Sequence, residues 1–185
     1  MMLRVIDFFS ALVGLLFLWP LLVAVMIFGY FDTKSPIFRQ VRVGKNQKPF
    51  TLIKFRTMSP DTQSVATHLA SQSSVTKFGA FLRKTKLDEL PQLVNVLKGE
   101  MSLVGPRPCL FNQKELIEAR EKNGVFDVLP GITGLAQVNA IDMSTPNELA
   151  DWDKRMIESM SLKNYFTYII QTATGSGAGD RIKNS

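Results

Sequence analysis

Two adjacent carboxylates, Asp88 and Glu89, are the side chains of this sequence best suited to chemistry. They lie in the segment Lys86–Gln92 (KLDELPQ), within a strongly basic part of the chain. Residues 33–107 hold thirteen lysines and arginines against four acids. Such a density of cations offsets the repulsion that an anionic nucleophile meets when it attacks a phosphate group. The pattern therefore points to chemistry on a phosphorylated substrate.

The same two acids also have a purely structural interpretation. Apolar residues at positions 90, 93, 94 and 97 have the spacing of one helical face, and Pro91 suits a first helical turn. Asp88 and Glu89 thus lie just before or at a helix N-terminus, where acids commonly cap free N–H groups. A helix N-terminus also receives phosphate oxygens, so position alone leaves capping and catalysis both open.

The elements before this helix are predicted to be a β-hairpin and a short basic helix. Residues 36–43 and 50–58 are rich in β-branched and aromatic side chains and are joined by turn-forming residues. Because side chains alternate along a strand, Lys54 and Arg56 lie on the same face of the second strand. A solvent-exposed face of the hairpin accounts for these two charges without any ligand. A polar loop is expected over 59–76 and a helix over 77–86.

The N-terminal part of the chain is strongly apolar. Residues 8–31 contain no charge, and at 1.5 Å per residue a helix of that length reaches about 36 Å, enough to cross a bilayer. A single spanning anchor is the simplest interpretation. However, Pro20 at the middle of the run predicts a bend, and basic residues flank both ends, Arg4 before it and Lys34 after it. The alternative is a re-entrant hairpin that enters one leaflet and returns.

Composition excludes several other classes of site. The chain has 185 residues, enough for one domain, and a single cysteine, Cys109, which rules out an internal disulfide framework. His68 is its only histidine, so neither a histidine-based triad nor a histidine-ligated zinc site is expected. The net charge of +6 suits nucleic acid, anionic lipid or phosphorylated substrates and does not choose among them.

Three further helices are expected towards the C-terminus. Residues 113–123 form a helix closed by Gly124, and its charges look merely solvated. Apolar stripes over 149–160 and 162–170 are typical of core-facing helices, although a location in the membrane headgroup plane is the alternative. The predicted fold class is therefore α+β and mainly helical, with an N-terminal re-entrant membrane hairpin, a short β-hairpin and several amphipathic helices at the membrane interface.

Five motifs in order resemble the bacterial sugar transferase family, and within it the small monotopic phosphoglycosyl transferases of the PglC-like type. Together they cover roughly residues 3–172, and the short length resembles the minimal catalytic form of that family. They are the apolar N-terminus with Pro20, Lys54–Met58 (KFRTM), Lys86–Gln92, Ser102–Pro108 (SLVGPRP) and Pro130–Gly134 (PGITG).

The resemblance implies an enzyme that transfers a phosphosugar from a UDP-sugar to undecaprenyl phosphate and releases UMP, the first membrane step of glycan and polysaccharide assembly. It implies Asp88 as the nucleophile that forms a covalent phosphosugar intermediate, Glu89 as the second catalytic acid, and Mg²⁺ as cofactor, with Asp88 as its ligand. Arg107, between two prolines, is the leading phosphate ligand because a guanidinium grips phosphate oxygens in a planar fork. The further nucleotide- or phosphate-binding candidates are Lys54, Arg56, Arg83, Thr133 and Gln137.

The resemblance also implies an organisation. Residues 1–32 would be the re-entrant membrane anchor, 33–172 a cytoplasmic catalytic domain on the bacterial inner membrane, and 173–185 a flexible tail. The expected partners are the UDP-sugar, undecaprenyl phosphate and the lipid bilayer, without nucleic acid, and the oligomeric state is left open. The family's N-terminal Lys-Arg pair appears here as Leu3-Arg4, so any anchoring role of that lysine is absent. The alternative function is a non-catalytic, membrane-anchored basic module that binds anionic lipid or nucleic acid.

Overall fold

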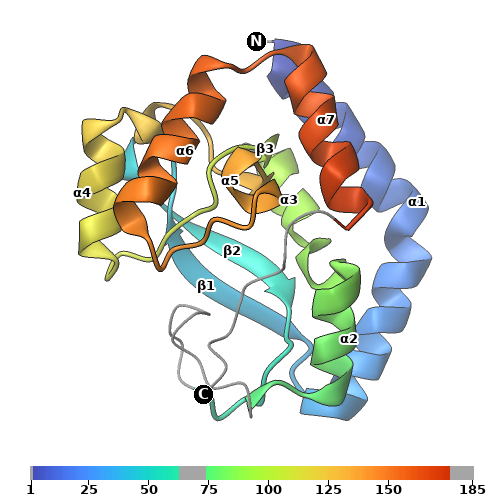
Figure 1. Cartoon of the computed structure of the whole chain (residues 1–185). Coiled ribbons are helices and arrows are strands. Elements are labelled where there is room, and N and C mark those ends of the chain that lie inside the picture. Colours follow the sequence, from blue (N-terminus) through green and yellow to red (C-terminus); the bar gives the residue numbers. More distant parts are fainter. Residues whose placement is uncertain (1, 63–73, 176–185) are drawn as a thin grey trace.

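The computed structural model describes residues 2–62 and 74–175, so His68, most of the expected polar loop and most of the expected tail lie outside the described part. Within it, the chain begins with one long helix, α1 (Met2–Thr33), which contains Pro20. Pro20 predicts a bend, and the re-entrant alternative predicts a helix broken there, whereas the structure has a single continuous helix that curves along one side of the molecule (Figure 1). A proline removes one helical hydrogen bond, which such curvature accommodates.

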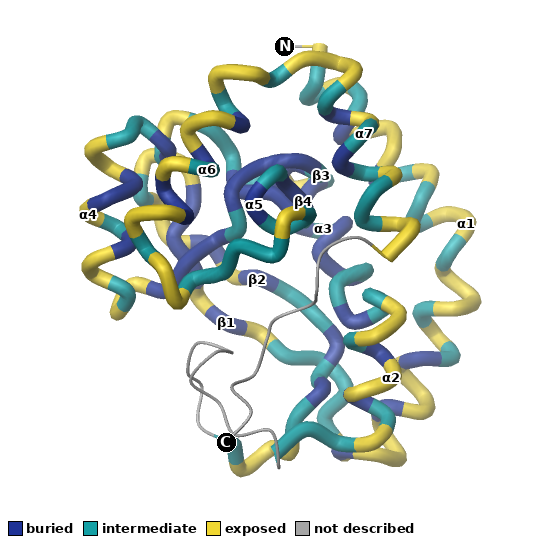
Figure 2. The backbone as a smooth tube through the Cα atoms, in the orientation of Figure 1, coloured by how far each residue is buried: buried dark blue, intermediate teal, exposed yellow. Residues whose placement is uncertain are grey.

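Helix α1 is the one helix among the described residues that is long and apolar enough to cross a membrane. Only 11% of its most apolar 18-residue stretch is buried inside the protein. Figure 2 shows exposed and half-buried residues along most of the helix. Its large exposed side chains include Phe17, Trp19 and Phe31. The helix therefore directs much of its apolar surface away from the protein core.

The predicted hairpin is confirmed. Strand β1 (Ile37–Val43) pairs antiparallel with β2 (Pro49–Phe55) across the turn η1 (Lys45–Gln47). Phe50 and Leu52 from β2 are buried against α1 and α3 (Gln92–Lys98), where Ala11 and Val96 are fully buried. This cluster fixes α3 between the hairpin and the first half of α1.

The two acids lie in a tight connection between two helices. Helix α2 (Lys77–Thr85) begins at Thr76, whose hydroxyl accepts a hydrogen bond from the Gly79 N–H at 2.8 Å. It ends at Lys86, which has a left-handed backbone (φ 59°). The chain then forms the short 3₁₀ turn η4 (Leu87–Glu89) before α3 begins at Gln92. Both helices were predicted, and η4 is the turn that presents Asp88 and Glu89.

A second, parallel pair of strands was not predicted. Strand β3 (Ser102–Val104) pairs with β4 (Gly131–Thr133), which brings the SLVGPRP and PGITG segments together. The backbones cross so closely that a Cβ on Gly131 would lie 2.0 Å from the Gly105 nitrogen. Only glycine fits this crossing, which fixes Arg107 and Thr133 relative to each other.

The remaining helices are α4 (Lys114–Lys122), η5 (Val125–Asp127), α5 (Leu135–Val138), α6 (Pro146–Glu158) and α7 (Leu162–Ala173). Of these, α7 packs against β3 and β4, and α4 packs against α6. The stripe over 149–160 faces the core, since Leu149 and Met156 are buried. Some apolar side chains of α7 face the core and others face outward. Tyr165 is fully buried, whereas Phe166 and Ile170 are 47% and 60% exposed. Figure 1 shows α7 near the N-terminal part of α1.

Candidate active site

Asp88 is a buried carboxylate in a cluster of charges. Its residue is only 6% exposed. Burial, and secondly the negative charge of Glu89, raise the pKa of Asp88 from 3.8 to about 6. The positive charges of Lys54, Arg83 and Arg107 act in the opposite direction and limit this rise. The structure thus gathers five of the sequence-predicted site residues from four segments of the chain.

Glu89 forms an ion pair with Arg107, with Oε1 and Nη1 3.1 Å apart. Their side chains are 13% and 25% exposed, so the pair lies at the edge of the protein surface. This contact orients Glu89 and places the guanidinium beside both acids. Arg107 therefore lies close enough to Asp88 for its charge to lower the pKa of that carboxyl, and its role as a phosphate ligand stays a prediction.

Two buried arginines hold the backbone that carries Arg107. Arg120 Nη1 donates to the Arg107 carbonyl at 2.8 Å, and Arg42 Nη1 donates to the Pro108 carbonyl at 3.1 Å. Arg120 is itself paired with Asp153, with Nη2 and Oδ2 2.7 Å apart and both side chains 2% exposed. The prediction that the charges of residues 113–123 are merely solvated is wrong for Arg120. The correction has a physical cause: its partner lies on α6, and a buried ion pair between two helices leaves no local sequence pattern.

Arg83 is fixed by one nitrogen and leaves another without a partner. Its Nε donates to the Thr57 hydroxyl at 2.9 Å. Its buried Nη1 has no hydrogen-bond partner among the described residues. A buried donor without an acceptor costs free energy, so an arriving phosphate oxygen would satisfy it.

The remaining predicted ligands are placed differently. Lys54 and Arg56 both lie over the Phe38 ring, so they share a face of β2 as expected. The Arg56 Nε donates to the Ser35 carbonyl at 2.8 Å, and its charge is not among those that act on Asp88. Gln137 Nε2 donates to the Ile132 carbonyl at 2.8 Å and supports β4. A ligand role for Arg56 or Gln137 stays a prediction.

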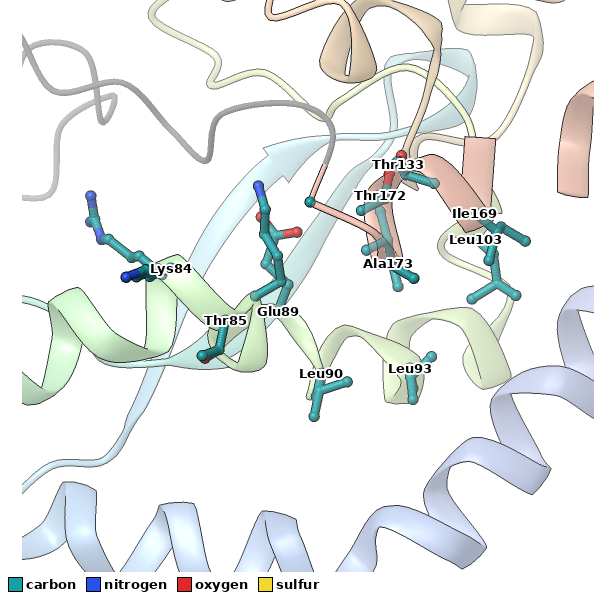
Figure 3. Close-up of a pocket in the computed structure, with 14 residues that line it drawn as sticks. Lys84, Thr85, Glu89, Leu90, Leu93, Leu103, Thr133, Ile169, Thr172 and Ala173 are labelled. Carbon is teal, nitrogen blue, oxygen red and sulfur yellow. Dashed lines mark hydrogen bonds between the residues drawn. The ribbon is translucent and has the colours of Figure 1, made fainter. Parts of the chain in front are cut away.

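A pocket of about 570 Å³ opens beside the acids and contains one more predicted residue, Thr133, whose hydroxyl is hydrogen bonded to that of Thr172. Figure 3 shows Lys84, Thr85 and Glu89 towards one end of this pocket and Leu93, Leu103 and Ile169 towards the other. Its volume falls in the range of about 300–1,000 Å³ that is usual for small-molecule sites. The full lining is Arg83–Lys86, Glu89, Leu90, Leu93, Leu103, Ile132, Thr133, Ile169, Thr172, Ala173 and Gly175.

The site offers few ligands for a metal ion. Within residues 2–62 and 74–175, no group of three or more histidine, cysteine or acidic side chains is placed to hold one. Asp88 and Glu89 are thus the pair that this site can contribute. Their mutual repulsion, which raises the pKa of Asp88, would be relieved by a divalent cation. Such an ion would complete its coordination with substrate phosphates and water, as Mg²⁺ commonly does.

Fold and site together define a protein with a long apolar helix and a buried carboxylate within the field of three basic side chains. The chain belongs to the bacterial sugar transferase family, whose profile matches residues 1–177. It is 48% identical over 122 residues to the uncharacterized sugar transferase EpsL of Bacillus subtilis, a match that covers 64% of this chain and 60% of the relative.

Two further relatives have more specific names. The UDP-glucose:undecaprenyl-phosphate glucose-1-phosphate transferase of Xanthomonas campestris pv. campestris is 39% identical over 156 residues, covering 81% of this chain and 32% of the relative. The UDP-galactose-lipid carrier transferase of Erwinia amylovora is 33% identical over 186 residues, covering 91% of this chain and 39% of the relative. The chain therefore spans less than two thirds of the length of each of these three relatives.

Proposed function

We propose that this protein is a phosphoglycosyl transferase that moves a phosphosugar from a UDP-sugar to undecaprenyl phosphate and releases UMP. The observation that carries the proposal is Asp88, a buried carboxylate beside Glu89 and within the field of three cations. The names of the Xanthomonas and Erwinia relatives support the substrate classes, a nucleotide sugar and a lipid carrier.

In the first step, a carboxylate oxygen of Asp88 attacks the sugar-linked phosphorus of the UDP-sugar. The bond from that phosphorus to the bridging oxygen breaks, and UMP leaves with the bonding electrons. In the second step, a phosphate oxygen of the lipid attacks the same phosphorus, which breaks its bond to Asp88 and restores the carboxylate. Division into two displacements is what covalent catalysis by a carboxylate achieves.

The basic side chains suit the charge that develops in both steps. The charges of Arg107, Arg83 and Lys54 act on Asp88 in the resting protein, which supports a role for them near the transferred phosphorus. Preorganised cations of this kind stabilise a phosphoryl transition state without reorganisation. Mg²⁺, if held by Asp88 with Glu89 beside it, would add charge neutralisation of the phosphate oxygens.

The location is proposed to be the inner membrane, with α1 entering one leaflet and returning. Both ends of α1 contact the same body: Arg4 donates to the Met101 carbonyl at 3.2 Å, and Asp32 accepts from the Thr76 hydroxyl at 2.6 Å. A helix that spans the bilayer puts its ends on opposite sides of a core of about 30 Å. Contacts of both ends with one domain therefore favour a re-entrant arrangement. The cytoplasmic face is proposed for the site because a UDP-sugar is its substrate.

The test is UMP release from detergent-solubilised protein with magnesium, undecaprenyl phosphate and a panel of UDP-sugars. We expect release with wild type and with Asp61→Asn, a matched control at an exposed aspartate, and loss with Asp88→Asn. Equal release by Asp88→Asn would contradict the role of Asp88. Absence of release with every sugar, from folded protein, would favour a binding module without chemistry.

A further inference from the structure

The pocket beside Glu89 has separate polar and apolar ends, and we propose that it binds a polyprenyl phosphate, with the first isoprenoid units at its apolar end and the phosphate at its basic end. This inference rests on the proposed function, because it assigns a place to the acceptor of the second step. The pocket lies between α3 and α7, at the end of η4 that carries Glu89.

The apolar end of the pocket is lined mainly by hydrophobic side chains. Its lining side chains come from four elements and from the connection before α3: Leu90, Leu93, Leu103, Ile132, Ile169 and Ala173. The hydroxyls of Thr133 and Thr172 are hydrogen bonded to each other, so one of these two donors is already satisfied within the protein. The hydroxyls and charges of a nucleotide sugar would be left unpaired against such a wall, at a cost that a hydrocarbon chain does not meet.

The polar end adjoins the reacting carboxylate. Arg83, Lys84 and Lys86 line it together with Glu89, which follows Asp88 directly in η4. Lipid phosphate carries negative charge, so three cations favour it at this end. A phosphate held there would stand next to the phosphosugar that Asp88 carries after the first step.

The position of the pocket gives a lipid chain a path from the bilayer. Leu93, which lines the pocket, also lies against α1, since a Cβ on Gly14 would be 3.2 Å from its Cδ1. The pocket also includes residues of α7, whose Phe166 and Ile170 are exposed and do not line the pocket. The apolar end thus lies beside the two helices that direct apolar surface outward.

Thiol protection tests the assignment directly and does not depend on turnover. The single native cysteine, Cys109, is fully buried, so an introduced thiol is the site that a maleimide labels. Ala173→Cys places the thiol at an exposed residue of the pocket lining. Ile170→Cys, at an exposed residue of the same helix that does not line the pocket, is the control. Farnesyl phosphate at about ten times its Kd should slow labelling of Ala173→Cys about tenfold, by mass action, and leave Ile170→Cys unchanged.

Three probes identify the occupant. Inorganic phosphate should give no protection, because it lacks the chain. Protection by UMP would assign the pocket to the nucleotide, and protection by phosphatidylglycerol would make it a groove for bilayer lipid; either result overturns the proposal. Absence of protection by farnesyl phosphate, or equal protection of Ile170→Cys, overturns it as well.

Kinetics separates this inference from the proposed function. Ala173→Phe should raise the KM for undecaprenyl phosphate about tenfold, the effect of displacing about two methylene groups, whereas Ile170→Phe should leave it within about twofold. The first step releases UMP in the absence of lipid acceptor, and Ala173→Phe should leave this release intact. A tenfold fall in it would indicate damage to the reacting carboxylate and contradict the assignment. UMP release without thiol protection refutes the pocket alone, and protection without UMP release from any UDP-sugar refutes the proposed function alone.

Discussion

Replacement of Asp88 by asparagine is expected to make the protein more stable while it abolishes turnover. The folded protein holds the pKa of Asp88 at about 6, above its ordinary 3.8, because the carboxylate is buried beside Glu89. A group with a raised pKa stabilises the folded state below its unfolded pKa and loses that contribution as pH rises through the folded pKa. Ionised Asp88 therefore destabilises the fold above pH 6, and Asp88→Asn removes this cost.

The magnitude follows from the two pKa values. A rise from 3.8 to about 6 corresponds to about 3 kcal/mol at pH 8. For a chain of this size, about 3 kcal/mol raises Tm by about 6–12 °C. The difference in Tm between Asp88→Asn and wild type should be largest at pH 8, shrink as pH falls through 6, and vanish near pH 4.

Thermal unfolding in detergent with EDTA, followed from pH 4 to pH 8, is the assay. EDTA removes divalent cations that would otherwise neutralise the carboxylate. Asp61→Asn, at an exposed aspartate, serves as the control and should show no such pH-dependent gain. A variant no more stable than wild type at pH 8, or a difference that does not change with pH, would refute the argument.

Three further predictions concern the groups around this carboxylate. Rapid-quench measurement of the first step should show a tenfold loss of rate per pH unit below the pKa of Asp88, since this carboxyl must be ionised to attack. Glu89→Gln should move this acidic limb to lower pH by removing a repulsive charge, and an unmoved limb would contradict this. Arg120→Met should lower the free energy of unfolding in urea by about 3–5 kcal/mol, because Asp153 is left buried without its partner, and adding Asp153→Leu should restore most of it; no recovery in the double variant would count against the ion pair. Tyr165→Phe, which removes the 2.6 Å hydrogen bond from the Tyr165 hydroxyl to Asp7, should cost about 1.5–3 kcal/mol in the same assay, and an unchanged midpoint would show that the bond contributes nothing.

The elements with strong local signals were predictable from sequence. The hairpin followed from two β-rich runs around a turn, and α2 and α3 followed from apolar spacing together with Pro91. Their order placed Asp88 and Glu89 at a helix junction, which the structure confirms. The gathering of Lys54, Arg83 and Arg107 around Asp88 came from the family resemblance, because no local pattern brings together residues that lie far apart in the chain.

The features that sequence analysis missed depend on contacts between distant segments. Strands β3 and β4 have three residues each, too few to show the alternation of side chains that marks a strand. The residues between 104 and 131 separate them in the sequence. Arg120 and Asp153 have ordinary helical surroundings, and only the packing of α4 on α6 buries them. The continuity of α1 through Pro20 is a third case, since proline predicts a bend but does not decide whether the helix stops.

The most direct test of the central claim is the intact mass of the protein after incubation with a UDP-sugar and magnesium in the absence of lipid acceptor. The mechanism predicts a mass increase equal to one phosphosugar, located at Asp88 by peptide mapping, absent from Asp88→Asn and removed by undecaprenyl phosphate. UMP release without any mass increase in wild type, or an adduct on Asp88→Asn, would contradict the claim that Asp88 is the nucleophile.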